Sequence, residues 1–241
     1  MSKADREKEV FEKFSMVAPF KVLPGSIESR PPPEPDILCQ LDTSEYVAFE
    51  LTELIDQEYM ARLGLMFSTK QYLDSYWKTN LNPVDSRRFR DKYRDALINF
   101  EYCQETSLKD RKAVAVIAFS KLLDLPENSE GEFFKSDPEL MPNLKWIQIC
   151  RVGVPEPIID VASAGWLGDP TEPTIKKKFS KTYVTEHPIE LLAHINWGIM
   201  PLEEVWKASA DNVSSMISGS PFRKFWVYDC TDNKIKYEFE K

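Results

Sequence analysis

Hydrophobic residues near the start of the chain recur with two different periods. Between residues 3 and 18 they return every three or four positions, which predicts an amphipathic helix. The residues of this apolar stripe are Val10, Phe11, Phe14 and Val17. Residues 37–41 and 46–51 are short apolar runs separated by the polar sequence DTSE, and this arrangement predicts a β-hairpin. We therefore expect a helix followed by two paired strands.

The remainder of the chain alternates between helical and strand patterns. Residues 57–125 carry mainly helical patterns, with 86–103 predicted as one helix, and we expect a helical insertion or subdomain there. Strand patterns at 145–152 and 157–166 flank the turn sequence GVPEP and predict a strand pair. The later elements expected are a helix at 174–183, a buried strand at 189–197, a helix at 202–218 and a C-terminal hairpin at 223–240. These patterns predict a mixed α/β protein in which residues 1–241 form a single domain.

The net charge of the chain and the distribution of its basic residues limit the functions that the protein can have. The chain carries a net charge of −8, which disfavours a protein that coats nucleic acid in general, because phosphate contacts require Lys and Arg. The basic residues nevertheless cluster, in RRFRDKYRD at 87–95, in IKKKFSK at 175–181 and in FRK at 222–224. An acidic protein with such basic strips is able to hold a polyanion at one face.

Several other signals are negative. The N-terminal sequence MSKADREKEV is charged, and no apolar run approaches the roughly 20 residues of a membrane helix, so we expect a cytoplasmic protein with no membrane partner. The 4 cysteines are widely spaced, as is typical of reduced thiols, and the 2 histidines lack the spacing of a helical metal pair. The sequence contains neither a Gly-x-Ser-x-Gly elbow nor a P-loop, which disfavours an enzyme of another kind.

A carboxylate falls in the middle of the second strand of the predicted hairpin. Because side chains alternate between the two faces of a strand, Glu50 and Thr52 share one face and Leu51 lies on the other. Burying an acid in such a strand is costly unless the acid is paired or binds a cation. Asp36 stands at the start of the preceding strand, so the two carboxylates are placed to converge on a hard divalent cation.

Pro35-Asp36, followed by Glu50-Leu51-Thr52, resembles the P-D-(x)n-(D/E)-x-K signature of the PD-(D/E)xK nuclease superfamily. The resemblance covers residues 3–55 and implies a restriction-endonuclease-like core sheet flanked by helices. It also implies a site for Mg²⁺ or Mn²⁺. The implied metal ligands are the carboxylates of Asp36, Glu50 and Glu7 and the backbone carbonyl of Leu51, with Glu7 on the apolar stripe of the first helix.

Thr52 departs from this signature, because it stands where the signature has a lysine. Some members of the superfamily carry that lysine on a later helix, and the helix at 174–183 is the candidate here. Its helical angle turns Lys178 toward the sheet, within about 8 Å of the Glu50 carboxylate, and Lys181 is the second candidate. The expected catalytic residues are Asp36, Glu50 and Lys178. Loss of Lys178 is expected to stop cleavage while leaving the affinity for divalent ions nearly unchanged.

The sequence supports two functions from different classes. The first is a metal-dependent nuclease that uses a metal-activated water to hydrolyse phosphodiester bonds of nucleic acid, with DNA favoured over RNA and both left open. The residues expected to hold the nucleic-acid backbone are Arg87, Arg88, Arg90, Lys181, Arg223 and Lys224. The alternative is a catalytically inactive nuclease-fold scaffold that acts as a protein-interaction or assembly factor, which the presence of Thr52 favours. Both functions leave a homodimer or another protein partner open.

Overall fold

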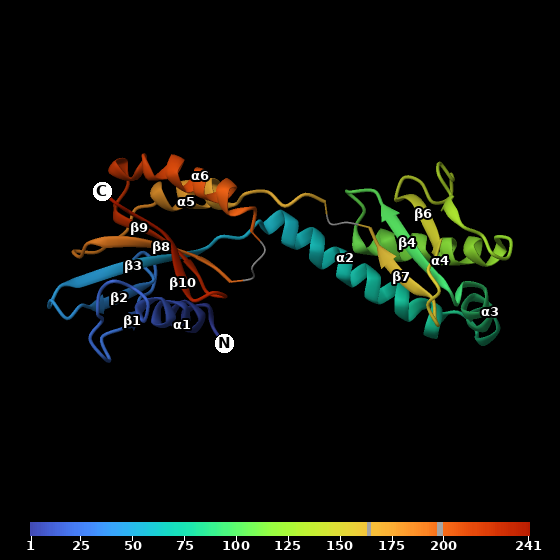
Figure 1. The fold of residues 1–241 in the computed structure, drawn as a ribbon, viewed down its shortest axis with the longest axis horizontal. Coiled ribbons are helices and arrows are strands. Elements are labelled where there is room, and N and C mark those ends of the chain that lie inside the picture. Colours follow the sequence, from blue (N-terminus) through green and yellow to red (C-terminus); the bar gives the residue numbers. More distant parts are fainter. Residues whose placement is uncertain (163–164, 197–199) are drawn as a thin grey trace. The chain divides into compact units, whose positions relative to one another are not determined.

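The computed structural model describes residues 1–162, 165–196 and 200–241, and the chain divides into two compact units (Figure 1). Unit 1 comprises Met1–Gln57 and Leu167–Lys241, and unit 2 comprises Glu58–Trp166. The chain therefore leaves unit 1 after its N-terminal part, forms unit 2 and returns to complete unit 1. Each unit combines helices with a mixed sheet, so the predicted mixed α/β class is confirmed.

Unit 1 is built on a six-stranded sheet. Its elements are α1 (Lys3–Ser15), β1 (Glu28–Ser29), β2 (Ile37–Gln40), β3 (Tyr46–Glu53), α5 (Thr171–Phe179), β8 (Ile189–Ile195), α6 (Glu203–Ser214), the 3₁₀ turn η2 (Ile217–Gly219), β9 (Phe222–Asp229) and β10 (Lys234–Glu240). The strand order is β1-β2-β3-β8-β9-β10. Strands β3, β8 and β9 run parallel, whereas the pairs β2–β3 and β9–β10 are antiparallel, which confirms both predicted hairpins.

Helices cover both faces of the sheet in unit 1. α1 packs on one face, where Phe11 and Phe14 are fully buried. The ring of Phe11 lies 4.8 Å from that of Phe49 in β3, and the ring of Phe14 lies 5.4 Å from that of Trp226 in β9. α5 and α6 lie over the opposite face (Figure 1), and Ile175 of α5 is fully buried there. Strand β3 is thus buried on both faces, so a carboxylate in its interior cannot avoid burial.

Local sequence explains where α1 begins and which face it presents. The Ser2 hydroxyl accepts a hydrogen bond of 3.1 Å from the Asp5 N–H, and the Asp5 carboxylate accepts one of 2.9 Å from the Ser2 N–H. This capping box satisfies backbone donors that the helix itself leaves unpaired. The helix ends at Ser15, three residues before the predicted end at residue 18.

Unit 2 has its own sheet and core. Its elements are α2 (Gln57–Ser75), the π-helical turn η1 (Tyr76–Asn80), α3 (Pro83–Tyr93), β4 (Ala96–Tyr102), α4 (Leu108–Asp124), β5 (Gly131–Phe133), β6 (Leu144–Arg151) and β7 (Ile158–Val161). The strand order is β5-β6-β4-β7, and only the β4–β7 pair among these is parallel. The fully buried aromatic residues of its core are Trp77, Phe89, Tyr93, Phe100 and Phe119.

Two predictions about residues 58–166 were wrong. The segment 86–103 is not one helix, because α3 ends at Tyr93 and Ala96 begins strand β4. Burial alternates along β4 at every second residue, so the sequence ALINFEY follows the strand period and not the helical one. The predicted strands at 145–152 and 157–166 exist as β6 and β7 but do not pair with each other, because β4 lies between them.

Two of the predicted strands are longer than the strands in the structure, and both predicted segments include positions that lie outside the described residues. Strand β7 covers only Ile158–Val161 of the segment 157–166, and positions 163–164 of that segment lie outside the described residues. Strand β8 corresponds to the predicted buried strand at 189–197, of which position 197 also lies outside them. In the part of the chain that the structure describes, no helix combines the length and the apolar character needed to cross a membrane.

The aromatic layer under α1 provides a test of this fold. We expect Phe14→Ala to lower the free energy of unfolding by about 3–5 kcal/mol, because the substitution leaves a cavity among buried rings. Urea denaturation of the full chain measures this change. The matched control is Phe67→Ala, in which the replaced ring is 53% exposed and the expected change is within about 0.5 kcal/mol. Equal effects of the two substitutions would contradict the packing of α1 described here.

Candidate active site at the carboxyl end of strand β3

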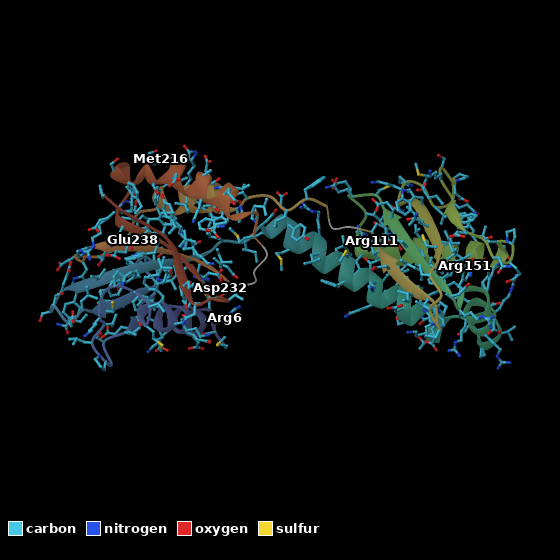
Figure 2. The ribbon with its side chains drawn as sticks, in the orientation of Figure 1. Arg6, Arg111, Arg151, Met216, Asp232 and Glu238 are labelled. Atoms are coloured by element: carbon cyan, nitrogen blue, oxygen red, sulfur yellow. The ribbon has the colours of Figure 1, made fainter. Side chains whose placement is uncertain are left out.

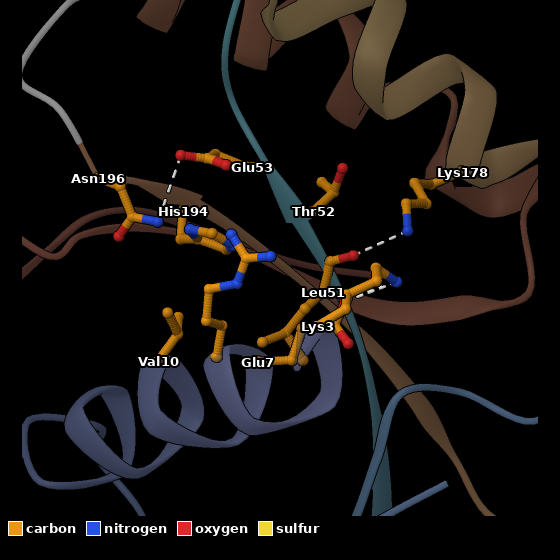
Figure 3. Close-up of a pocket in the computed structure, with 10 residues that line it drawn as sticks. Lys3, Glu7, Val10, Leu51, Thr52, Glu53, Lys178, His194 and Asn196 are labelled. Carbon is orange, nitrogen blue, oxygen red and sulfur yellow. Dashed lines mark hydrogen bonds and ion pairs between the residues drawn. The ribbon is translucent and has the colours of Figure 1, made fainter. Parts of the chain in front are cut away.

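A pocket opens in unit 1 where strands β3 and β8 end (Figure 3). Its volume is about 520 Å³, and its lining comes from α1, β3, α5 and β8. Because β3 and β8 are parallel, their carboxyl ends meet at the same edge of the sheet. Ligands of open α/β sheets bind in crevices outside such carboxyl ends. The pocket is therefore in the part of the fold where a substrate site is expected.

Asp36 reaches this edge from the residue before β2. Its Oδ2 accepts a hydrogen bond of 2.9 Å from the backbone N–H of Leu51 in β3. This bond crosses the predicted hairpin and holds the Asp36 carboxylate beside the end of β3. The Asp36 charge also raises the pKa of the Glu50 carboxyl, so the two acids are close enough to interact. The structure thus places Asp36 beside the strand that carries Glu50, and the convergence of the two carboxylates on a cation stays a prediction.

Glu50 is a buried carboxylate with a basic partner. Its residue is only 4% exposed, and burial followed by the Asp36 charge raises its pKa, while Lys178 and Lys181 act in the opposite direction. The Nζ of Lys178 donates a hydrogen bond of 2.5 Å to Glu50 Oε1. The same Nζ donates a bond of 2.7 Å to the backbone carbonyl of Leu51. The Nζ of Lys181 lies 3.8 Å from Glu50 Oε1.

The direction of Lys178 follows from the apolar face of α5. Ile175 is fully buried in the core of unit 1 and fixes the rotation of this helix on the sheet. Lys178, three positions later, then points to the end of β3, on the same side of that strand as Thr52 (Figure 3). Lys176 and Lys177 are exposed. The approach of Lys178 to Glu50 expected from the helical angle is therefore confirmed, whereas its catalytic role stays a prediction.

α1 contributes charged residues to the opposite wall of the pocket (Figure 3). Glu7 lines the pocket, and its Oε1 lies 2.8 Å from the Nζ of Lys3. The same Lys3 Nζ lies 3.7 Å from Asp36 Oδ1, so this lysine links the two acids. Arg6 lines the pocket as well. The sequence analysis did not include Lys3 or Arg6, although the four-residue spacing between Lys3 and Glu7 places both on one helix face.

His194 is a second residue that the sequence analysis missed. It lies on β8 opposite Glu53 of β3, lines the pocket and is only 6% exposed. Burial, and then the nearby charge of Lys178, lower the pKa of His194 to about 4. Its Nδ1 is buried without a hydrogen-bond partner among the described residues. Only the parallel pairing of β3 with β8 brings this imidazole to the pocket, and no local motif signals it.

Tyr183 adds a hydroxyl near Glu50. This oxygen is buried beside the Glu50 carboxylate, which interacts with it. Burial raises the pKa of Tyr183, and the nearby Glu50 carboxylate raises it further. The site therefore holds a neutral hydroxyl and a neutral imidazole beside its charged groups.

Two further residues predicted to hold nucleic acid, Arg223 and Lys224, form ion pairs with other acids of unit 1. Arg223 pairs with Glu45 at 2.6 Å and with Glu190 at 2.9 Å. Lys224 pairs with Glu238 at 2.6 Å. Of the predicted basic residues, Lys178 and Lys181 form ion pairs with Glu50.

The three predicted arginines of α3 belong to unit 2. Arg88 donates a hydrogen bond of 2.8 Å to the backbone carbonyl of Leu123, and the guanidinium of Arg90 lies 5.8 Å from the ring centroid of Trp77. Arg87 lines a separate hollow of unit 2 together with Arg88. These contacts lie within unit 2, and the predicted role of the three arginines in holding nucleic acid stays a prediction.

The oxygen atoms at the end of β3 are of the type that hard cations prefer. Lys178 Nζ contacts one carboxylate oxygen of Glu50 and the carbonyl oxygen of Leu51, and Asp36 Oδ2 accepts a hydrogen bond from the N–H of the same Leu51. Mg²⁺ commonly takes one or two carboxylates and keeps several waters, so this donor set fits it. Among the described residues, no group of three or more His, Cys, Asp and Glu side chains is placed to hold a metal ion.

A comparison of the chain with protein-family models, with curated proteins and with solved structures gives no match. The relation to PD-(D/E)xK nucleases is thus a resemblance of residues and spacing.

The buried His194 predicts a defined dependence of stability on pH. The native pKa of about 4 lies below the ordinary 6.5, so the unfolded chain binds this proton more tightly. Protonation therefore disfavours the native state as the pH falls from 6.5 to 4. Wild type should therefore lose stability relative to His194→Gln as the pH falls. We expect the free energy of unfolding of wild type, minus that of His194→Gln, to decrease by about 3 kcal/mol between pH 7 and pH 4.

Urea denaturation of both proteins at each pH measures this difference. Carboxylates shared by the two proteins titrate in both, so their contribution cancels in the comparison. A difference that stays constant between pH 7 and pH 4 would contradict a buried, neutral His194.

Proposed function

We propose that this protein is a metal-dependent nuclease that hydrolyses phosphodiester bonds of DNA. One observation carries the proposal. Lys178, which is 127 positions away from Leu51 in the sequence, donates hydrogen bonds to both Glu50 Oε1 and the Leu51 carbonyl. The pair of acids and the lysine of the PD-(D/E)xK signature thus occur together in space, although Thr52 replaces the lysine in the sequence.

In this proposal Asp36, Glu50 and the carbonyl of Leu51 would hold Mg²⁺ or Mn²⁺. When bound, the ion would polarise the scissile phosphate and lower the pKa of a water molecule. Asp36 is already oriented for this role, because its Oδ2 is fixed by the Leu51 N–H. Glu7 lines the same pocket and is held by Lys3, so it is available as an outer ligand.

The lysines of the pocket have a separate role. The ammonium of Lys178 would orient the attacking water or stabilise the charge that develops on the phosphate. Lys181 and Lys3 carry further positive charge near the two acids, and Arg6 lines the same pocket. Cations at this edge would attract a phosphodiester to a molecule whose net charge is −8.

Cleavage assays on linear single- and double-stranded DNA with Mg²⁺ or Mn²⁺ test the proposal. We expect Asp36→Asn, Glu50→Gln and Lys178→Ala each to lower the cleavage rate by about 100-fold or more, because each removes a charge at the reacting phosphate. The matched control is Lys177→Ala, which removes an exposed lysine of the same helix and should change the rate by less than about twofold. RNA of the same sequence is the comparison substrate.

The absence of cleavage by wild type with either ion would contradict the proposal. Equal activity of wild type and all three variants would do so as well, since it would trace the cleavage to another protein.

The contacts of Lys178 change the expectation for metal affinity. From the sequence, loss of this lysine is expected to leave the affinity for divalent ions nearly unchanged. In the structure its ammonium contacts two of the three oxygen donors, so an entering ion must displace it. We therefore expect Lys178→Met to bind Mn²⁺ about tenfold more tightly than wild type, because an opposing charge is removed from the site.

Titration calorimetry with Mn²⁺ in the absence of nucleic acid measures this change. Lys177→Ala should bind Mn²⁺ as wild type does, and Glu50→Gln should bind it at least about tenfold more weakly. Weaker Mn²⁺ binding by Lys178→Met than by wild type would show that the lysine supports the ion and does not compete with it.

The same contacts also favour the second candidate function. An internal ammonium that satisfies Glu50 and the Leu51 carbonyl stabilises the fold without any metal. A catalytically inactive scaffold would keep this ion pair and have no need of Mg²⁺. The Mn²⁺ titration separates the two, because a scaffold of this kind binds no ion at millimolar concentration even after Lys178→Met.

A further inference from the structure

Unit 2 contains a pocket of its own, at the carboxyl ends of its two parallel strands. These strands are β4 and β7, which run side by side in the sheet. The pocket has a volume of about 340 Å³ and is lined by residues of α2, β4, α4, β6 and β7 and by Gln104, Ala162, Gly165 and Trp166. It lies within residues 58–166, so its existence does not depend on the site in unit 1.

Two buried polar side chains line this pocket. Arg111 of α4 is 8% exposed, and its Nε donates a hydrogen bond of 3.0 Å to the Thr106 carbonyl (Arg111 is labelled in Figure 2). Its guanidinium lies 4.8 Å from the ring centroid of Tyr102, which is 5% exposed. The Tyr102 hydroxyl is buried and has no hydrogen-bond partner in the described part of the chain. A buried polar group without a partner is costly, which indicates that a ligand completes this site.

Positive charge predominates in the lining. Besides Arg111, the pocket is lined by Arg62 of α2 and Lys145 of β6, against one acid, Glu101. Lys145 Nζ lies 3.2 Å from Glu101 Oε1, and the Lys145 side chain is 51% exposed, so it is able to turn toward a ligand. Arginine forks and a lysine together suit the oxygens of a phosphate group.

An exposed aromatic side chain also lines the pocket. Trp166 is 95% exposed, and Arg62 donates a hydrogen bond of 2.9 Å to its backbone carbonyl. This bond ties the backbone at Trp166 to α2 at the pocket. The indole is therefore accessible to a ligand, and an aromatic face of this kind stacks readily on a nucleobase.

We propose that this pocket binds a mononucleotide unit that carries a phosphate monoester. The phosphate contacts Arg111, Lys145 and the Tyr102 hydroxyl, and the base stacks on Trp166. A volume of about 340 Å³ is at the small end of the range for ligand pockets and suits a ligand of this size. The ligand is either a free nucleotide or the 5′-phosphorylated end of a strand, since both present the same chemical groups.

Titration calorimetry of the full chain with adenosine 5′-monophosphate tests this proposal. EDTA in the buffer excludes divalent ions, so the result does not depend on the proposed nuclease site. We expect adenosine 5′-monophosphate to bind at least about tenfold more tightly than adenosine, because the hydrogen bonds to its phosphate are charge-assisted. We also expect it to bind more tightly than ribose 5-phosphate, which has no base to stack on Trp166.

Exposed residues provide variants that should still fold. We expect Lys145→Ala and Trp166→Ala each to weaken the binding of adenosine 5′-monophosphate about fivefold or more. The matched control is Lys135→Ala, which removes another lysine of unit 2 that is 63% exposed and ion-paired with a glutamate, Glu132. It should leave the affinity unchanged within about twofold. Arg111→Lys tests the buried guanidinium directly, provided that circular dichroism shows a folded protein.

The outcomes separate the possibilities. A strand end is the ligand if a 5′-phosphorylated oligonucleotide binds more tightly than both its 5′-hydroxyl form and adenosine 5′-monophosphate. A free nucleotide is the ligand if adenosine 5′-monophosphate binds more tightly than the 5′-phosphorylated oligonucleotide. Equal binding of adenosine and its monophosphate, an equal loss of affinity in Lys135→Ala and Lys145→Ala, or no binding at millimolar concentration would overturn the proposal.

Discussion

The ion pair between Glu50 and Lys178 is the interaction on which the candidate site depends. Each charge would be costly in the interior by itself, and removing one partner of a buried pair costs about 3–5 kcal/mol. Together with the Leu51 carbonyl, the pair fixes α5 over the end of β3. Asp36 is held to the same strand by the Leu51 N–H, so one residue of the strand backbone positions both the acid and the base.

Glu190 shows that the sheet also contains a buried carboxylate with a purely structural set of partners. It is 4% exposed, as Glu50 is, but its two oxygens accept hydrogen bonds from Trp226 Nε1 at 2.7 Å and from Arg223 Nε at 2.9 Å. Each of its two carboxylate oxygens thus accepts a hydrogen bond from a side-chain donor. Glu50 instead lies beside a second acid and borders a pocket, which is an arrangement that favours chemistry over stability.

The insertion of unit 2 into the chain of unit 1 has a simple physical basis. The chain leaves unit 1 after β3 and returns before α5, and long insertions at such points cost little in loop-closure entropy. Within unit 1, the segment by which the chain leaves after β3 is joined to the segment by which it returns before α5. Asp56 Oδ2 in the first segment accepts a hydrogen bond of 2.8 Å from the Gly168 N–H in the second. A Cβ at residue 168 would lie 3.1 Å from that oxygen, so glycine suits this close approach.

Local patterns in the sequence determined the first helix, both hairpins of unit 1, the placement of Asp36 opposite β3 and the direction of Lys178. Each of these follows from side-chain periodicity within one element or one turn, which acts over a few residues. The tertiary structure alone decided that β4 lies between β6 and β7 and that Lys3, Arg6 and His194 line the pocket with Lys178. These features depend on which strands pair over long sequence separations, and periodicity is the same whichever partner a strand takes.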